Sequence, residues 1–302
     1  MGQIMGFEGR VEYVKEATYG SLPYTSTLGW IGDVRSFSVE LAVERKNRYR
    51  LRPRGATNAR TPAGVSSGKE KYSVKIEWAP QASGDVYTYM SFVGLMIGTT
   101  TGIGDARESC VINAVHKDGT VEGPLLGCVC NSFSAKCSVG EDVIFEAELL
   151  ANDYTPTTAL NVTSDLTGVT DGFEQAGEAT GEVLDYTDVT ITLSGTAQSF
   201  VTDFEFKIEN NAEERYRIFT GAKPDEVVQK PAKITGKLTY DLVNNTELLR
   251  AKNGDTFELA ITIGEKTWTF GGCYWDKSGI DQGAEDAVQE EMPFTATTIT
   301  IA

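Results

Sequence analysis

The sequence predicts a mainly β protein made of two tandem, duplicated β-domains with few short helices. Short alternating runs rich in Val, Ile, Thr, Phe and Tyr are broken by Gly, Asn, Asp and Pro, which is typical of strands and turns. Helical periodicity is scarce. An internal echo joins "NRYRLR" at 47–52 to "ERYRIF" at 214–219. With 302 residues, 40% of them hydrophobic, the chain is long enough for two ordinary domains, and one large β-domain is the alternative.

The clearest strand patterns follow one another along the first half of the chain. Alternation predicts strands at 35–44, 71–78, 131–137 and 141–150. The last two flank "SVGE" and therefore predict a hairpin. Residues 105–119, "DARESCVINAVHKDG", are the best candidate for a helix.

Four blocks of the first half return in order in the second half. Phe37 corresponds to Phe204 and "RYRL" at 48–51 to "RYRI" at 215–218, both at the same offset along the chain. "GK" at 68–69 corresponds to "GK" at 236–237, with the offset larger by a single position. "GCV" at 127–129 and "EDVIFEAELLA" at 141–151 correspond to "GCY" at 272–274 and "EDAVQEEMPFT" at 285–295, at a shorter offset. About 22 extra residues around 85–104 explain the change of offset, and blocks that keep their order predict a duplicated domain.

The duplication divides the chain into four segments. We expect an N-terminal arm at 1–34, a first domain at 35–160, a linker at 161–185 and a second domain at 186–302. The stretch near 155–185 is polar and rich in Gly and Thr, which is typical of a linker with short strands. The long loop "RPRGATNARTPAGVSSGKEK" after the first "RYR" favours a binding role. The alternative without a binding role is that "RYR" lies at an exposed strand end, where the Tyr packs and the arginines are solvated.

The net charge of −16 is unevenly distributed. Residues 1–80 carry a balance of +5, whereas the rest of the chain carries −21. A protein that grips nucleic acid needs an extended basic face, because its affinity comes largely from neutralising phosphates. The composition therefore argues against tight DNA binding, and we expect the basic cluster at 45–60 to meet carboxylates instead.

The sequence offers little that could carry catalysis. The single histidine, His116, precedes "KDG" and suits a turn or helix end, and no nucleophile elbow, P-loop or calcium-loop spacing is present. We therefore predict no enzymatic activity and no cofactor. The five cysteines are odd in number and irregularly spaced. A metal site at Cys128, Cys130 and Cys137 is an alternative, but buried free thiols fit the strand spacing better.

The alternation leaves two architectures open for about eight strands. Closed on themselves, they would form an ordinary small barrel filled by side chains. Continued by neighbouring copies, three chains would supply 24 strands and form an intersubunit β-barrel roughly 45–50 Å across, wide enough for a DNA duplex. In that arrangement the polar face would line water and every strand edge would be paired.

Several blocks resemble the tail tube proteins of tailed bacteriophages and tailed archaeal viruses. They are "GCVCNSFSAKCSVGEDVIFEAELLAND", "FVTDFEFKIENN" followed by "RYRIFTGAKP", "KITGKLTYDLV", and the opening "EATYGSLPYTSTLGWIGDVRSF". The resemblance covers most of the chain. It implies rings with a β-barrel lumen that stack into a hollow tube for viral DNA. Because most such proteins carry one domain and form hexamers, two copies per chain imply a trimeric pseudo-hexamer.

The resemblance gives the polar residues specific roles. The expected lumen-facing residues are Glu40, Glu44, Lys75, Glu77, Glu146, Glu148, Glu205, Lys207, Glu209 and Asp241. The expected inter-ring contacts, in the arm and the long loop, are Arg48, Arg50, Arg52, Arg54, Arg60, Tyr19 and Trp30. An acidic bore would repel phosphate, so that DNA slides through without sequence-specific binding.

The partners implied are further copies of the chain and other tail proteins such as the tape measure and the terminator. No membrane insertion is expected, since no run of 18 apolar residues occurs, and the N-terminal sequence lacks the pattern of a secretion signal. We expect the protein in the virion tail, and in the host cytoplasm before assembly. The alternatives are the inner tube of a contractile injection or secretion machine and a baseplate hub or tail-end ring.

Overall fold

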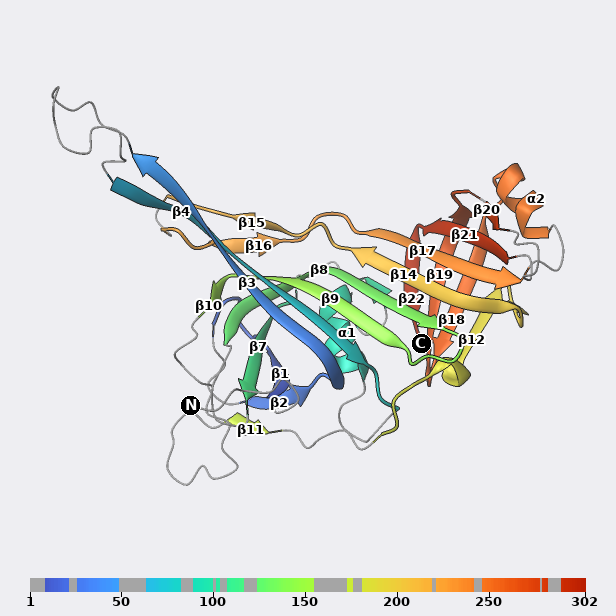
Figure 1. Ribbon diagram of the computed structural model, residues 1–302, viewed down its shortest axis with the longest axis horizontal. Helices are drawn as coiled ribbons and strands as arrows, with labels where there is room; N and C mark the ends of the chain where they lie inside the picture. The colour runs from blue at the N-terminus through green and yellow to red at the C-terminus, as the bar shows by residue number, and fades with distance from the viewer. Residues whose placement is uncertain are drawn as a thin grey trace.

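The computed structural model is mainly β, as the sequence predicts (Figure 1). It describes residues 9–21, 26–48, 64–82, 89–99, 102–103, 108–116, 124–154, 173–175, 181–218, 221–241, 246–277, 279–281 and 289–302. The elements of the first half are β1 (Gly9–Lys15), β2 (Ser26–Trp30), β3 (Asp33–Arg48), β4 (Gly64–Ala79), α1 (Tyr89–Ile97), β5 (Gly98–Thr99), β6 (Gly102–Ile103), β7 (Cys110–His116), β8 (Leu125–Ser138), β9 (Ile144–Ala151), β10 (Asp153–Tyr154) and β11 (Phe173–Gln175).

The second half begins with a short 3₁₀ turn, Tyr186–Asp188, which Asp185 caps. Its remaining elements are β12 (Val189–Leu193), β13 (Thr196–Ala197), β14 (Val201–Glu209), β15 (Glu213–Arg215), β16 (Glu226–Val228), β17 (Lys233–Asp241), α2 (Thr246–Asn253), β18 (Phe257–Ile263), β19 (Lys266–Trp275), β20 (Gly279–Asp281), β21 (Gln289–Ala296) and β22 (Thr298–Ile301).

One antiparallel sheet, here called the main sheet, runs through both halves. Its strand order is β3–β4–β9–β8–β14–β17–β21, and β20 and the end of β19 pair with the far side of β21. The junction between the halves is the pairing of β8 with β14, which extends from Asp203–Ser138 to Glu209–Ser132. Within the described residues, β3 pairs only with β4 and β20 only with β21. The main sheet is therefore open at both edges.

Each half covers the apolar face of the main sheet with a layer of its own. In the first half, β2, β1, β7 and the start of β8 pair in that order, and α1 packs against β8. In the second half the order is β13–β12–β18–β19–β22, and the short strand β6 of the first half pairs with β22. Strands β8 and β19 each pass from a cover layer into the main sheet.

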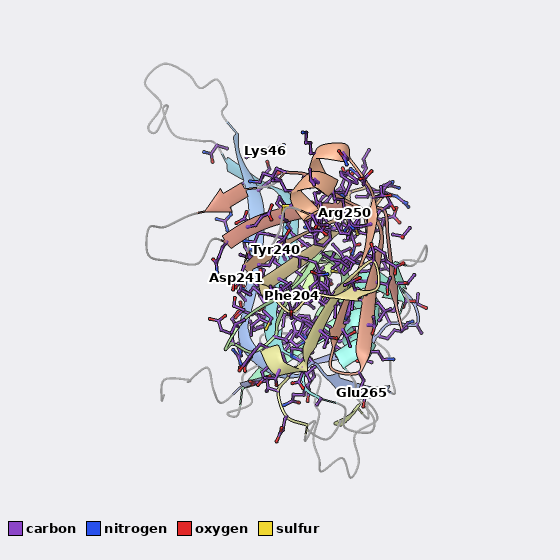
Figure 2. The ribbon with its side chains drawn as sticks, turned by 90° about the vertical axis from the view of Figure 1, so that its right-hand side faces the viewer. Lys46, Phe204, Tyr240, Asp241, Arg250 and Glu265 are labelled. Carbon is purple, nitrogen blue, oxygen red and sulfur yellow. The ribbon has the colours of Figure 1, made fainter. Side chains whose placement is uncertain are left out.

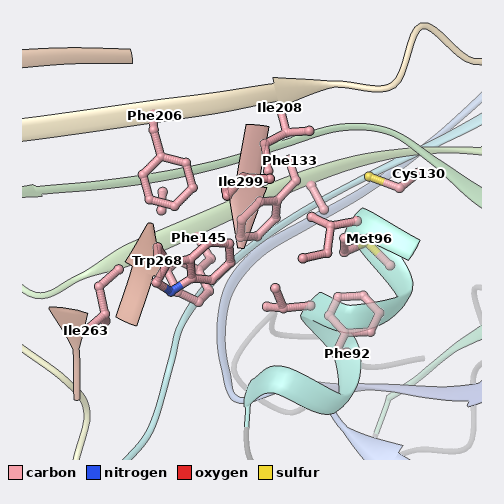
Figure 3. Packing of buried hydrophobic residues seen from close by; sticks show 14 of the residues in the cluster. Phe92, Met96, Cys130, Phe133, Phe145, Phe206, Ile208, Ile263, Trp268 and Ile299 are labelled. Carbon is pink, nitrogen blue, oxygen red and sulfur yellow. The ribbon is translucent and has the colours of Figure 1, made fainter. Parts of the chain in front are cut away.

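The cover layers and the main sheet enclose one hydrophobic core that both halves share. Phe133 and Phe145 of the first half meet Trp268 of the second, at ring-centroid distances of 5.8 and 6.4 Å (Figure 3). Phe206 lies 5.1 Å from the same indole. Because large aromatic side chains contribute strongly to core stability, these contacts hold the two halves together as one unit.

The strand expectations for 35–44, 71–78, 131–137 and 141–150 are confirmed, and β8 and β9 form the predicted hairpin. The expectation of a helix at 105–119 is wrong. Residues 110–116 form β7, whose side chains from Cys110 to Ala114 are buried among strands on both sides. Short apolar runs fit a buried strand as well as a helix, and here pairing with β1 decides. The helices described lie at α1 and α2 instead.

The two halves repeat the same pairing order. The neighbours β1–β7–β8–β9–β4–β3 of the first half match β12–β18–β19–β21–β17–β14 of the second, and a helix follows β4 and β17 alike. When β14 is aligned with β3 by matching Phe204 to Phe37, the two pairing registers place Gly236 at the position of Val74. This alignment does not bring together the "GK" blocks at 68–69 and 236–237, whose correspondence stays a prediction.

A bulge recurs at the same place in β8 and β19. Gly127 and Gly272 have positive φ angles of 62° and 59°, and in both strands the pairing register shifts beside them. The next residues, Cys128 and Cys273, each donate their S–H to the carbonyl three positions earlier, at 3.4 and 3.2 Å. A glycine bulge bends a strand, which explains how both strands pass from a cover layer into the main sheet.

Candidate functional site: the polar face of the main sheet

The face of the main sheet that points away from the core carries rows of polar side chains that cross both halves. Residues directly opposite each other in paired strands share a face. One such row consists of Lys75 on β4, Glu148 on β9, Ser132 on β8, Glu209 on β14 and Lys233 on β17. The next row consists of Glu77, Glu146, Ser134, Lys207 and Thr235 on the same strands. We call this surface the polar face.

The expected lumen-facing residues come together on the polar face, with one difference. The registers place there Glu40, Lys75, Glu77, Glu146, Glu148, Glu205, Lys207, Glu209 and Asp241. Glu44 lies instead at a bulge between Val43 and Arg45, where β3 and β4 leave the body of the sheet. Sequence alternation located the face because period 2 survives wherever a strand carries no bulge.

Three lysines on the polar face were missing from the expected set. Lys136 and Lys237 both lie opposite Glu205, and Lys233 lies opposite Glu209. A signal was available, since Lys136 alternates with the buried Ala135 in β8. The polar face is therefore less acidic than the sequence suggested, although carboxylates still outnumber lysines on it.

The charges of the polar face are arranged as close, partly exposed pairs. Lys207 Nζ lies 2.9 Å from Glu209 Oε1, and this hydrogen bond lowers the pKa of the Glu209 carboxyl. Lys237 Nζ lies 3.7 Å from Glu291 Oε2. Such exposed pairs add little stability. Their effect is to break up the negative potential while leaving a hydrated, charged surface.

Two hairpins leave the main sheet at the same end, where β9 finishes at Ala151 (Figure 1). The first hairpin consists of the outer parts of β3 and β4, and the second consists of β15 and β16. Figure 2 shows Lys46 of the first hairpin toward the top of the view and Glu265 of the β18–β19 turn toward the bottom. The opposite end of the sheet carries the acidic β8–β9 turn, with Glu141 and Asp142, and the capped turn, with Asp185 and Asp188.

The expected inter-ring residues are only partly described. Arg50, Arg52, Arg54 and Arg60 lie outside the described residues, as do the side chains of Arg48 and Trp30. Tyr19 is described and is engaged within its own chain. Its hydroxyl accepts a hydrogen bond from the backbone N–H of Val227 at 2.8 Å, and the two residues pack with Val129 and Leu150 in a small cluster.

The second "RYR" copy binds within the chain. Tyr216 donates its hydroxyl hydrogen to the carbonyl of Glu70 at 2.7 Å, and Lys69 Nζ lies 4.7 Å from the centre of its ring. Arg215 and Arg217 form ion pairs with carboxylates of the same hairpin, at 3.5 and 3.0 Å. The second hairpin thus lies across β4 of the first half, so it joins the two halves of the chain, and its arginines are paired.

The described part of the chain contains no group of three or more His, Cys, Asp or Glu side chains placed to hold a metal ion. All five cysteines are free and buried, as the sequence favoured, and burial raises the pKa of Cys137 and of Cys273 to about 11. Neither described helix is long and apolar enough to cross a membrane.

Comparison with known proteins agrees with the resemblance. No curated protein matches the chain significantly. A family model described as phage tail tube protein matches residues 6–296, which is nearly the whole chain and includes both halves of the main sheet. The family assigns the protein a structural role in a virion tail. The chain therefore belongs to the phage tail tube protein family.

Proposed function

We propose that three copies of this chain form a ring, that the rings stack into a tube, and that the polar face lines the bore through which viral DNA passes. The observation that carries the proposal is the continuity of the polar face across the β8–β14 junction. A surface of alternating charges that extends over the strands of both halves suits a water-filled channel. Partners would be other copies of the chain and tail proteins such as a tape measure and a terminator.

Domain duplication is part of the proposal. The repeated pairing order and the repeated glycine bulge at Gly127 and Gly272 support it, because two unrelated domains would have no reason to share both. With two similar domains in each chain, a trimer would present six similar segments around its axis, as a hexamer of a single-domain protein would.

Ring stacking is supported by the distribution of charge along the tube axis. Both hairpins leave one end of the main sheet, and the described part of the first includes the start of the basic cluster, Arg45 and Lys46. The opposite end is acidic, with carboxylates in both of its turns. Head-to-tail stacking would therefore bring opposite charges together, and such contacts guide association and specificity more than they add affinity.

The test is electron microscopy of the purified protein, which should show long hollow tubes. Replacing Arg52 and Arg54 with Glu should leave single rings intact and stop their stacking. Lys252→Glu on the exposed face of α2 is the control for added negative charge and should not affect tubes. Tubes of normal length in the double variant would refute the role of the loop, and a compact monomer in the wild type would refute the whole proposal.

A further inference from the structure

The structure contains, within one chain, a junction between two domains that can serve as a template for the junction between two chains. At the β8–β14 junction, the first main-sheet strand of the second half, β14, pairs with the last part of β8. In the repeated pairing order, β14 matches β3, and the last part of β8 matches β20. Both β3 and β20 are edges of the main sheet, with no further partner among the described residues.

The match between β20 and β8 holds residue by residue. In the first half Ser134 lies opposite Glu146, and in the second half Gly279 lies opposite Glu291. The difference in residue number between Ser134 and Gly279 equals the difference between Glu146 and Glu291. The glycine bulges of β8 and β19 are related by the same difference. β20 therefore corresponds to the part of β8 that pairs with β14.

The first hairpin also matches the second hairpin in register. Asn47 lies opposite Val65 in the first, and Glu214 lies opposite Val227 in the second. The difference in residue number between Asn47 and Glu214 equals the difference that relates β3 to β14. The difference between Val65 and Val227 equals the one that relates β4 to β17. The agreement of both hairpins fixes the correspondence along the whole length of β3.

We propose that the edge strand β3 of one chain pairs antiparallel with β20 of the next chain, in the register of the β8–β14 junction: Ser38 opposite Asp281, Val39 opposite Ile280 and Glu40 opposite Gly279. This inference rests on the proposed ring and specifies how its subunits join. The partner is a second copy of this chain, and the resulting sheet is continuous from one chain to the next.

Exposed apolar side chains on both edges are explained by this pairing. Leu41 is 50% exposed, whereas its counterpart at the β8–β14 junction, Ile208, is fully buried. Tyr274 is 41% exposed, whereas its counterpart Val129 is fully buried beneath the second hairpin. In the ring, the first hairpin of the next chain would cover Tyr274 as the second hairpin covers Val129. Large exposed apolar side chains at an unpaired sheet edge are typical of association surfaces.

The hydrogen-bond pattern of the template predicts which pairs are closest. At the β8–β14 junction the N–H of Val139 donates to Thr202, and that of Asn210 donates to Asn131. Opposite pairs in an antiparallel ladder alternate between hydrogen-bonded and non-hydrogen-bonded pairs. Because the pairs Val139–Thr202 and Asn131–Asn210 are hydrogen-bonded, Lys136–Glu205 is a non-hydrogen-bonded pair, the type in which side chains approach most closely. Its counterpart between chains is Ser38–Asp281, a suitable position for a disulfide.

The decisive experiment is disulfide trapping in assembled rings. The variant Ser38→Cys/Asp281→Cys should cross-link under mild oxidation into covalent trimers, and each single variant should not. The matched control Glu40→Cys/Asp281→Cys is displaced by two positions on the same face and should stay monomeric on a non-reducing gel. The native cysteines are buried and should not interfere.

The outcomes separate this inference from the proposed function. Rings that cross-link in the control pair, or in neither pair, would overturn the register while the tube function stands. Absence of rings in the wild type would remove both. Should the cysteine variants not assemble, hydrogen exchange on the wild-type protein decides. Assembly should slow the amides of Phe37, Val39 and Leu41 by about tenfold or more and those of Ser38 and Glu40 far less. Equal rates before and after assembly would overturn the pairing.

Discussion

At the scale of single residues, Glu290 is the least satisfied polar group of the described core. It lies on β21 directly opposite Tyr240, is fully buried, and receives no hydrogen bond of normal geometry at either carboxylate oxygen from the described residues. Burial is the main cause that raises the pKa of its carboxyl; the nearby Tyr240 hydroxyl partly offsets this effect, and the neighbouring carboxylate of Glu247 adds to it. A buried acid of this kind favours its neutral form.

The raised pKa makes a prediction about pH. The stability that protonated Glu290 contributes is fully present below the ordinary glutamate pKa and is lost as pH rises through the raised value. Glu290→Gln keeps the neutral shape, so the free energy of unfolding of the variant should fall less than that of the wild type between pH 4.5 and 8. Urea unfolding at several pH values measures this, with Glu258→Gln on the exposed face of β18 as control. Parallel curves would contradict the prediction.

Gly127 illustrates a backbone requirement at the same scale. Its φ is 62°, and a Cβ placed on it would lie 2.7 Å from the Cβ of Asn152. Gly140 in the β8–β9 turn also has a positive φ, but no atom lies within 4 Å of the corresponding point. A side chain at Gly140 would therefore cause backbone strain only, whereas one at Gly127 would cause backbone strain and steric overlap.

Replacing each glycine with Ala should give different costs. Gly140→Ala should reduce the free energy of unfolding by about 1 kcal/mol through strain alone. Gly127→Ala adds an overlap that β8 cannot relieve without leaving its register, so we expect about 2–3 kcal/mol. Thermal and urea unfolding measure both changes. Equal losses would show that packing around the bulge is soft.

At the scale of elements, the second hairpin determines how the two halves are held beyond the shared core. It contacts β4 through Tyr216 and Glu70, and it contacts β8 and β9 through the cluster around Val227. Lys223 also pairs with Asp153 at 2.5 Å. These contacts lie far apart in sequence, so local patterns could not reveal them.

Removing one hydroxyl tests the attachment of the hairpin. Tyr216→Phe deletes the hydrogen bond to the Glu70 carbonyl and should cost about 1 kcal/mol, because the ring and its packing remain. We expect faster amide exchange in β15 and β16, with the core strands unchanged. Tyr186→Phe, at an exposed tyrosine, is the matched control. Unchanged exchange in the hairpin would show that its other contacts, among them the Glu70–Ala222 backbone hydrogen bond and the apolar cluster, hold it without this hydroxyl.

At the scale of the whole molecule, the proposed bore predicts how tubes behave toward DNA. Wild-type tubes should not retain duplex DNA, because the polar face carries more carboxylates than lysines. Converting Glu146, Glu148 and Glu205 to Lys should create DNA binding that weakens steeply with salt, since phosphate contacts release counterions. The control converts Asp255, Glu258 and Glu265, on the second half outside the polar face, with the same change in net charge. Equal DNA retention by both variants would refute the placement of the bore.

Much of the element content followed from local periodicity. The hairpin of β8 and β9 could be predicted because Phe145 and Ala147 alternate with Glu146 and Glu148 without interruption. The helix predicted at 105–119 failed because a fully buried strand has no polar alternation to distinguish it. The lysines of the polar face were missed although Lys136 alternates with buried neighbours, and their pairing with Glu205 and Glu209 shows that they belong to the same surface.

By itself the sequence determined that this protein is mainly β, that its second half echoes its first, and which alternate side chains are polar. These properties are local, because a strand exposes every second residue whatever it pairs with. Only the tertiary structure decided that β8 and β14 join the halves into one sheet, that Trp268 closes a common core, and that β3 and β20 remain as edges. Pairing between distant strands depends on the geometry of the whole chain, and no short window of sequence encodes it.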